Sequence, residues 1–305
     1  MTKNGAPEVV ATIGVFDGVH VGHQDLIGKV VERARRLGVS SCCVTFSPHP
    51  QEVLRPEVEL SHLCTLKDRL DLIKGLGVDD VLVIEFTRAL AQMLPEEFVH
   101  LLLRRHRIRE LWVGSDFALG RNRTGTPDKL AEIGRVEGFE VRPFDRVERF
   151  GAPVSSSRIR GLLVEGRVEE TAQLLGRPYR LSGVVGQGDR RGRTLGFATA
   201  NLTQMDNLCV PGNGVYAVWG RTRAGLVYPC VTNVGIHPTF GGTARQVEVH
   251  LLDFEGNLYG DSLNVDFVGR LRDELRFDSV EELIGQMKSD VVDARQLLAG
   301  TPPVA

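Results

Sequence analysis

Apolar runs and stretches with a helical pattern alternate along the first half of the chain. Val9–Phe16 is rich in apolar and β-forming residues, which is typical of a buried strand. From Gln24 to Leu37 apolar residues recur at helical spacing, and Gly38 follows them as a stop signal. The alternation continues with a strand at Ser41–Phe46, a helix at Lys67–Leu76, a strand at Asp80–Phe86, a helix at Pro95–Arg105 and a strand at Glu110–Gly114. This pattern predicts a parallel sheet with helices on both faces.

The pattern changes after about Pro178. Arg158–Leu175 is the last helical stretch before this point, and Ser279–Leu298 is the one long helical stretch after it. Between them lie short strand-like runs separated by turns rich in Gly and Asn: Leu181–Val185, Gly214–Trp219, Val227–Val231, Gln246–Asp253 and Leu263–Val268. Consecutive short strands predict a small antiparallel barrel or sandwich. We therefore expect two domains, residues 1–180 and 181–305.

The composition is that of a folded protein and excludes several classes. Of the 305 residues, 42% are hydrophobic and 25% are charged, which excludes a disordered or fibrous chain. The net charge of −2 provides no overall basic field to hold nucleic acid or an anionic membrane. Five scattered cysteines form no zinc-binding spacing, and an odd number of thiols fits a reducing compartment. The sequence contains no run of 18 apolar residues, so a cytoplasmic protein is expected.

The segment Gly14–His23 (GVFDGVHVGH) leaves the first strand, turns on two glycines and enters a helix. Ligands of parallel sheets bind beyond the carboxyl ends of the strands, which is where this segment lies. Both imidazoles of His20 and His23 can reach one point at the helix N-terminus, where backbone N–H groups and the helix dipole favour phosphate. We interpret them as donors to the charge that builds on a phosphoryl group during displacement. One alternative is a helix cap beside a packed histidine. Another is a metal site, although Cys or carboxylate ligands at matching intervals are missing.

A second candidate phosphate-binding segment opens the helix after Pro153. Ser155, Ser156, Ser157 and Arg158 place three hydroxyls and a guanidinium at a helix start, where the guanidinium can grip two phosphate oxygens. Serines also commonly cap helices, so a purely structural role is an equally good interpretation. Together with the two histidines, this cluster resembles the nucleotidyltransferase superfamily, whose members transfer a nucleoside monophosphate from a nucleoside triphosphate to an acceptor.

A glycine-rich basic loop, Gly186–Gly196, follows the first strand of the C-terminal half. It could fold over a polyphosphate through its backbone N–H groups, or its glycines could simply form a hairpin. It is neither a P-loop nor a dinucleotide fingerprint, because no Gly-Lys-Ser/Thr ends it and no helix follows. Thr199 and Asn201 are two residues apart and face the same side of an extended segment. Their hydroxyl and amide oxygens can complete a Mg²⁺ shell together with phosphate oxygens.

Gln246–Phe254 alternates as a strand, with Val247 and Val249 on one face and Glu248 and His250 on the other. A carboxylate on a barrel strand is suited to accept a hydroxyl proton during phosphoryl transfer. From the spacing alone, a solvent-facing glutamate is the favoured interpretation of Glu248.

Further motifs follow in a fixed order along both halves. The N-terminal half carries TFSPHP at 45–50, VGSDFALG at 113–120 and SSSRIR at 155–160, after GVFDGVHVGH. The C-terminal half carries GRTLGFATANL at 192–202, GVYAV at 214–218, NVGIHPTF at 233–240, VEVHLLDF at 247–254 and LYG at 258–260. In these motifs and their order, the chain resembles the bacterial bifunctional riboflavin kinase/FMN adenylyltransferase (FAD synthetase) family over nearly its whole length.

The resemblance implies a Rossmann-like nucleotidyltransferase domain with a parallel sheet, followed by a small riboflavin-kinase-like antiparallel β-barrel with a terminal helix. It places the catalytic residues His20 and His23 at the α-phosphate of ATP, and Ser156, Ser157 and the catalytic Arg158 on the outer phosphates. It places Thr199 and Asn201 at Mg²⁺ with ATP, and makes Glu248 the catalytic base. It extends nucleotide binding to Gly14, Phe16, Asp17, Gly22, Asp116, Gly186, Gly188, Gly192 and Gly196.

The implied chemistry has two steps, with riboflavin, FMN and ATP as small-molecule substrates. The 5′-hydroxyl of riboflavin, deprotonated by Glu248, attacks the γ-phosphate of ATP to give FMN. The phosphate of FMN then attacks the α-phosphate of a second ATP, which gives FAD and pyrophosphate. Two residues depart from the family pattern: Ala198 stands where Pro is usual, and Ser157 where Thr is usual. Neither change removes a ligand atom. The alternatives are a protein with one active module, the adenylyltransferase, and an inactive flavin- or nucleotide-binding regulatory paralogue.

Overall fold

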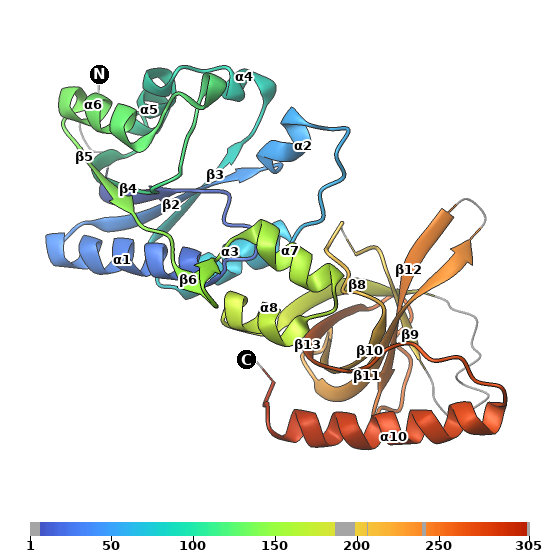
Figure 1. Ribbon diagram of the computed structural model, residues 1–305. Coiled ribbons are helices and arrows are strands. Elements are labelled where there is room, and N and C mark those ends of the chain that lie inside the picture. The colour runs from blue at the N-terminus through green and yellow to red at the C-terminus, as the bar shows by residue number, and fades with distance from the viewer. Residues whose placement is uncertain (1–6, 187–198, 206, 240–241, 304–305) are drawn as a thin grey trace. The chain divides into compact units, whose positions relative to one another are not determined.

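The computed structural model describes residues 7–186, 199–205, 207–239 and 242–303 of the chain (Figure 1). Residue contacts divide the chain into two compact units. The first unit comprises Met1–Leu60 and Thr65–Ser155, and the second comprises Ser61–Cys64 and Ser156–Ala305. Each unit has its own sheet and its own apolar core.

The first unit is built on a five-stranded parallel sheet with the strand order β3-β2-β1-β4-β5 (Figure 1). Its strands are β1 (Glu8–Ile13), β2 (Ser40–Ser47), β3 (Asp80–Glu85), β4 (Arg107–Gly114) and β5 (Glu140–Phe144). The central strand β1 pairs with β2 on one side and with β4 on the other. The parallel sheet predicted from the alternating pattern is therefore confirmed.

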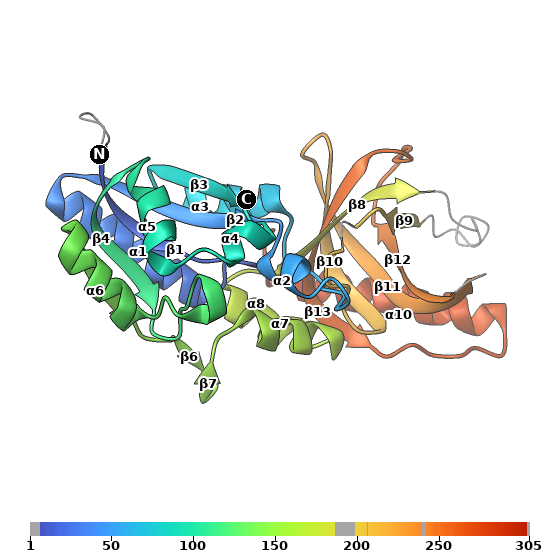
Figure 2. The same ribbon diagram turned by 90° about the horizontal axis from the view of Figure 1, so that it is seen from above.

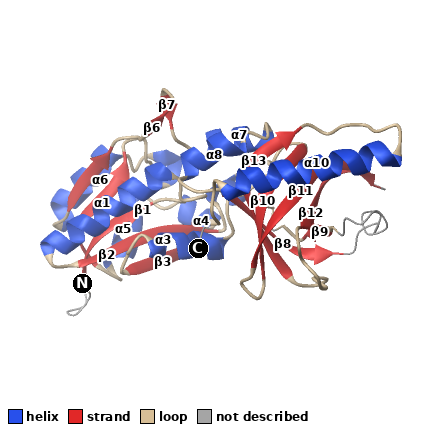
Figure 3. Ribbon diagram, turned by 90° about the horizontal axis from the view of Figure 1, so that it is seen from below, coloured by secondary structure: helices blue, strands red, loops and turns tan. Residues whose placement is uncertain are grey.

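Helices cover both faces of this sheet (Figure 3). Buried side chains of α1 (Val21–Leu37) and α3 (Leu66–Gly75) share a core with Cys43 of β2 on one face. Those of α5 (Pro95–Leu103) and α6 (Pro127–Glu137) share a core with β1, β2 and β4 on the other. The shorter elements include α2 (Pro50–Leu54), α4 (Arg88–Ala91), a 3₁₀ turn (Arg121–Arg123) and a hairpin of β6 (Glu148–Arg149) and β7 (Ala152–Pro153), which Figure 2 shows in profile.

The second unit is a closed barrel of antiparallel strands with the order β10-β11-β12-β9-β8-β13. Its strands are β8 (Tyr179–Gly186), β9 (Ala200–Thr203), β10 (Gly214–Thr222), β11 (Val227–Thr239), β12 (Gly242–Leu251) and β13 (Ser262–Arg272). The terminal helix α10 (Val280–Ala299) packs on the barrel through Ala294 and Leu298, which share a core with Ala217 and Val268. The sequence pattern was compatible with either a barrel or a sandwich. Because the strand pairing closes on itself, the second unit is a barrel.

The stretch predicted as one helix over Arg158–Leu175 is two helices, α7 (Ser156–Val164) and α8 (Val168–Leu175). They separate at Gly166, which has a left-handed backbone with φ 75°. A Cβ at this position would lie 2.6 Å from the Tyr216 hydroxyl oxygen, so the barrel approaches the backbone too closely for a side chain. The backbone N–H groups of Gly166 and Arg167 donate to the carbonyl oxygens of Leu163 and Leu162, so α7 ends in a local glycine cap, a stop signal that the prediction of one continuous helix overlooked.

Candidate functional site

The turn between β1 and α1 has a strained backbone. Phe16 and Val19 have positive φ angles of 55° and 40°, although neither is glycine and both are almost fully buried. A Cβ on Gly14 would lie 2.8 Å from the Phe16 ring, so this ring folds over the glycine. Strain of this kind persists only where the surrounding packing holds it, and it is concentrated at ligand sites.

The structure brings the two predicted histidines together at the start of α1. His20 is the N-cap residue, and its Nδ1 accepts a hydrogen bond from the backbone N–H of His23 at 3.3 Å. The two imidazole rings stack with their centroids 3.5 Å apart and an angle of 16° between their planes. The ring of Phe16 meets the His23 ring nearly edge-on at 5.1 Å. His20 is therefore a helix cap, as the structural alternative expects, and at the same time half of a histidine pair.

The electrostatics of His23 are unusual. Burial, reinforced by the neighbouring His20, holds the pKa of His23 well below its usual range, so the ring is neutral at pH 7. A neutral imidazole offers one N–H donor and one acceptor nitrogen. The Nδ1 atom of His23 is buried and has no hydrogen-bond partner among the described residues. A buried polar atom without a partner beside a helix N-terminus calls for an explanation, and a catalytic role is one.

Three further predicted residues lie at the same carboxyl edge of the sheet. Asp17 is almost fully buried within the turn. Gly22 lies in the first turn of α1, where a Cβ would come within 3.3 Å of the His20 ring. Asp116 lies two residues beyond the end of β4, the strand next to β1. Its side chain is exposed and forms an ion pair with Arg146.

One buried residue of this edge was missed by the sequence analysis. Arg69 of α3 is only 7% exposed, and its Nη1 donates to the carbonyl oxygen of Val15 at 2.9 Å. Its Nη2 donates to the carbonyl oxygen of Phe46 at 2.9 Å. The hydroxyl of Thr45 also donates to Val15, at 3.0 Å. Arg69 thus links the turn after β1 to the end of β2. The sequence analysis missed this residue because a single arginine in a helical pattern does not indicate burial.

Ser156, Ser157 and Arg158 form the first turn of α7, so the predicted helix start is confirmed. Ser156 and Arg158 are partly exposed, and Ser157 is exposed. Residue contacts assign α7 to the second unit, whereas the histidine pair lies in the first.

A row of polar residues crosses three strands of the barrel. Asn201 of β9 lies directly opposite Glu248 of β12, and Asn233 of β11 lies opposite Glu248 on its other side. Directly opposed residues share one face of a sheet. Val247 and Val249 are fully buried inside the barrel, so Glu248 and its two partners lie on the outer face.

The structure orients the amide of Asn201. Its Oδ1 accepts a hydrogen bond from Nε2 of Gln246 at 2.8 Å. Thr199 lies just before β9 and is partly exposed, and Gly186 lies opposite Asn201 on β8. The remaining predicted glycines lie within 187–198, outside the described residues: Gly188, Gly192 and Gly196.

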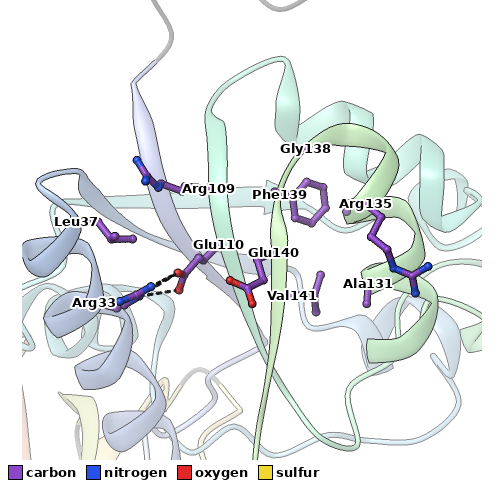
Figure 4. Close-up of a pocket in the computed structure, with 11 residues that line it drawn as sticks. Arg33, Leu37, Arg109, Glu110, Ala131, Arg135, Gly138, Phe139, Glu140 and Val141 are labelled. Atoms are coloured by element: carbon purple, nitrogen blue, oxygen red, sulfur yellow. Dashed lines mark hydrogen bonds and ion pairs between the residues drawn. The ribbon is translucent and has the colours of Figure 1, made fainter.

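A pocket of about 590 Å³ lies at the amino ends of β4 and β5, between α1 and α6 (Figure 4). Inside it, Arg33 forms a two-pronged hydrogen-bonded ion pair with the buried Glu110, with distances of 2.7 and 2.9 Å. This pairing lowers the pKa of Glu110. None of the predicted site residues lines the pocket. We attribute the ion pair to the attachment of α1 to the sheet.

The comparisons with known proteins agree with both halves of the chain. A family model described as FAD synthetase matches residues 2–158, and one described as riboflavin kinase matches residues 175–298. A protein from Pseudomonas fluorescens named bifunctional riboflavin kinase/FMN adenylyltransferase is 41% identical over 292 residues, which cover 95% of this chain and 93% of that protein. This chain belongs to the bifunctional riboflavin kinase/FMN adenylyltransferase family.

Other relatives of this family extend the match. A protein of the same name from Listeria monocytogenes is 36% identical over 293 residues, which cover 95% of this chain and 92% of that protein. The solved structure of a protein from Streptococcus pneumoniae, named macrolide-efflux protein, covers 95% of both chains with a TM-score of 0.87 and 31% sequence identity. Among the described residues of this chain, no helix is both long enough and apolar enough to cross a membrane.

Proposed function

We propose that this chain phosphorylates riboflavin to FMN with ATP and then adenylylates FMN to FAD with release of pyrophosphate. The observation that carries the proposal is the presence of a polar constellation in each unit, the histidine pair in the first and the Asn201–Glu248 pair in the second. Each lies within the part of the chain that the corresponding family model matches. Membership of a bifunctional family supports two active modules over one, and over an inactive paralogue.

In adenylyl transfer, His20 and His23 act at the α-phosphate of ATP. The phosphate of FMN is already an anion and needs no base, so this step depends on positioning and on stabilising the charge of the displacement. A neutral His23 can donate its ring N–H to a phosphoryl oxygen, and the first turn of α1 adds backbone N–H groups and the helix dipole. We assign the outer phosphates to Ser156, Ser157 and Arg158, whose hydroxyls and guanidinium suit them.

In riboflavin phosphorylation, Glu248 accepts the proton of the 5′-hydroxyl as that oxygen attacks the γ-phosphate of ATP, the bond from the γ-phosphorus to the bridging oxygen breaks and ADP leaves. Thr199 and Asn201 would hold Mg²⁺, because their hydroxyl and amide oxygens are the hard ligands that this ion prefers. The hydrogen bond from Gln246 orients the Asn201 amide with its oxygen as the acceptor. When bound, the ion would neutralise charge on the ATP phosphates.

We also propose that the protein is cytoplasmic and that the boundary between its two domains lies at residue 180. The five cysteines are all free thiols, which supports a reducing compartment. The helix α8 contacts β8 and β13, so residues that precede this boundary pack on the barrel.

The test is to incubate the purified chain with riboflavin, ATP and Mg²⁺ and to follow FMN and FAD by chromatography. We expect FMN to form first and FAD to follow. Conversion of supplied FMN to FAD without any phosphorylation of riboflavin would leave only the adenylyltransferase. The absence of both products, in a protein that still binds flavin, would identify a regulatory paralogue.

A further inference from the structure

Three side chains with different metal-binding atoms meet at the amino end of the parallel sheet. Cys42 is the third residue of β2 and Asp80 is the first of β3, and the two are paired in register. His106 immediately precedes β4. The Cys42 sulfur, an Asp80 carboxylate oxygen and a ring nitrogen of His106 all lie within 4.8 Å of one another. We refer to these three residues as the Cys–Asp–His cluster.

Two of the three distances between ligand atoms of the cluster lie within about 0.6 Å of those in a tetrahedral zinc site. Nε2 of His106 lies 2.8 Å from Oδ2 of Asp80, and Sγ of Cys42 lies 4.0 Å from the same oxygen. Zinc bonds of about 2.3 Å to sulfur and about 2.1 Å to nitrogen and oxygen separate tetrahedral S and O ligands by about 3.6 Å, and N and O ligands by about 3.4 Å. To reach these separations, the sulfur approaches the carboxylate by about 0.4 Å and the imidazole withdraws from it by about 0.6 Å.

The cluster is buried on the side of Cys42 and His106 and is accessible to solvent on the side of Asp80. Cys42 is 1% exposed, and the side chains of His106 and Asp80 are 13% and 51% exposed. A cation can therefore enter past the carboxylate while the sulfur and the imidazole remain shielded. Three protein ligands with an open side leave the fourth position of a tetrahedral ion to water.

We propose that the Cys–Asp–His cluster binds a thiophilic divalent cation of the Zn²⁺ type. Mixed sulfur and imidazole ligands select such ions, whereas Mg²⁺ and Ca²⁺ prefer sites made of oxygen. Burial, reinforced by the Asp80 carboxylate, raises the pKa of Cys42 to about 12, so the thiol keeps its proton until a cation replaces it. On binding, a metal–sulfur bond forms, the S–H bond breaks and its proton passes to water.

The proposed metal site is separate from the proposed adenylylation site. The cluster lies at the amino ends of β2 and β3, whereas Gly14–His23 follows the carboxyl end of β1. The cation would tie together β2, β3 and the connection from α5 to β4. Binding and stability can therefore be measured without reference to either transferase activity.

The experiment uses the full chain, stripped of metal by a chelator and titrated with Zn²⁺ against a chromogenic competitor. We expect the wild type to bind one ion per chain. His106→Gln should bind Zn²⁺ at least about tenfold more weakly, because even residues that only contact metal ligands typically change metal affinity by about 10–100-fold. His100→Gln is the matched control, since His100 also contacts a carboxylate, Glu137, at 2.9 Å but has no thiol in that pair. Zn²⁺ should also raise the melting temperature of the wild type and of the control, and raise that of His106→Gln by less at the same Zn²⁺ concentration.

Substitution with Co²⁺ tests the sulfur ligand directly. A cobalt–thiolate bond gives a charge-transfer band in the near ultraviolet, and Cys42→Ala should lack it. Should Cys42→Ala fail to fold, the band in the wild type and its loss in His106→Gln decide the question. Equal Zn²⁺ affinity in the wild type and His106→Gln, or a wild type without the cobalt–thiolate band, would overturn the proposal.

Discussion

Arg69 donates a hydrogen bond from Nη1 to the carbonyl oxygen of Val15, so a buried cation holds the turn that carries the strained Phe16. The same guanidinium reaches the carbonyl oxygen of Phe46, the last but one residue of β2. It therefore fixes the ends of two adjacent strands at the edge where ligands of parallel sheets bind. We regard Arg69 as a positioning residue for the proposed adenylylation site.

Replacing Arg69 with Met keeps an unbranched side chain in place and removes both donors. Hydrogen bonds from charged groups are worth about 1.5–3 kcal/mol each, so we expect a lower melting temperature and slower conversion of FMN to FAD. Riboflavin phosphorylation should stay close to the wild-type rate below the new melting temperature. The control is Arg36→Met, which removes an exposed ion pair with Glu32 on α1. An Arg69→Met protein that matches this control in stability and in both rates would show that the two hydrogen bonds position nothing.

Replacing His23 with Ala removes one ring of the stacked pair. Loss of one preorganised donor to a developing phosphoryl charge typically slows a reaction by about 10²–10³-fold, and we expect FAD formation from FMN to slow by this factor. Riboflavin phosphorylation, measured in the same preparation, serves as the internal control. Equal loss of the two activities would mean that His23 supports the fold rather than the transfer.

The lowered pKa of His23 also predicts how stability depends on pH. In the unfolded chain the imidazole has its ordinary pKa of about 6.5, whereas in the folded chain burial and His20 keep it neutral to lower pH. Below about pH 6.5 the unfolded state binds the proton first, so the folded state loses stability as the pH falls toward the folded pKa. Urea unfolding at pH 7.5 and pH 5.5 should show a smaller loss for His23→Ala than for the wild type. An identical loss in both proteins would show that other groups cause the pH dependence.

The fold could be predicted from the sequence wherever pattern and local structure agree. The apolar run that begins at Val9 and the helical spacing up to Leu37 report a buried strand and an amphipathic helix directly. The edge strand β5 was missed because it is short, contains Pro143 and alternates with charged residues, a composition that only an edge strand tolerates. The break at Gly166 is a local glycine cap that the apolar spacing alone does not reveal, whereas the close approach of Tyr216, 50 positions away in sequence, follows only from the fold.

In the candidate site, too, some features could be predicted from local sequence and others follow only from the fold. The H-x-G-H spacing predicted that His20 and His23 meet at a helix start, because residues three apart share a helix face. The burial of Arg69 follows from the fold, since it is the packing of α3 on the sheet that places the guanidinium at the ends of two strands. The pairing of Asn201 with Glu248 is likewise set by strand register, which brings together residues 47 positions apart.

Glu248→Gln separates a catalytic base from a surface carboxylate. Glutamine has nearly the same shape, so the pairing with Asn201 and Asn233 on the outer face of the barrel should survive. The neutral amide cannot accept the 5′-hydroxyl proton of riboflavin, and general-base catalysis contributes about 10²–10⁴-fold. FMN formation should therefore fall at least about a hundredfold, while conversion of supplied FMN to FAD persists. Glu255→Gln, a change at an exposed glutamate of the same half, is the control and should leave both rates unchanged. If Glu248→Gln phosphorylates riboflavin as fast as this control, the base lies elsewhere and Glu248 is only a partly exposed carboxylate of the barrel.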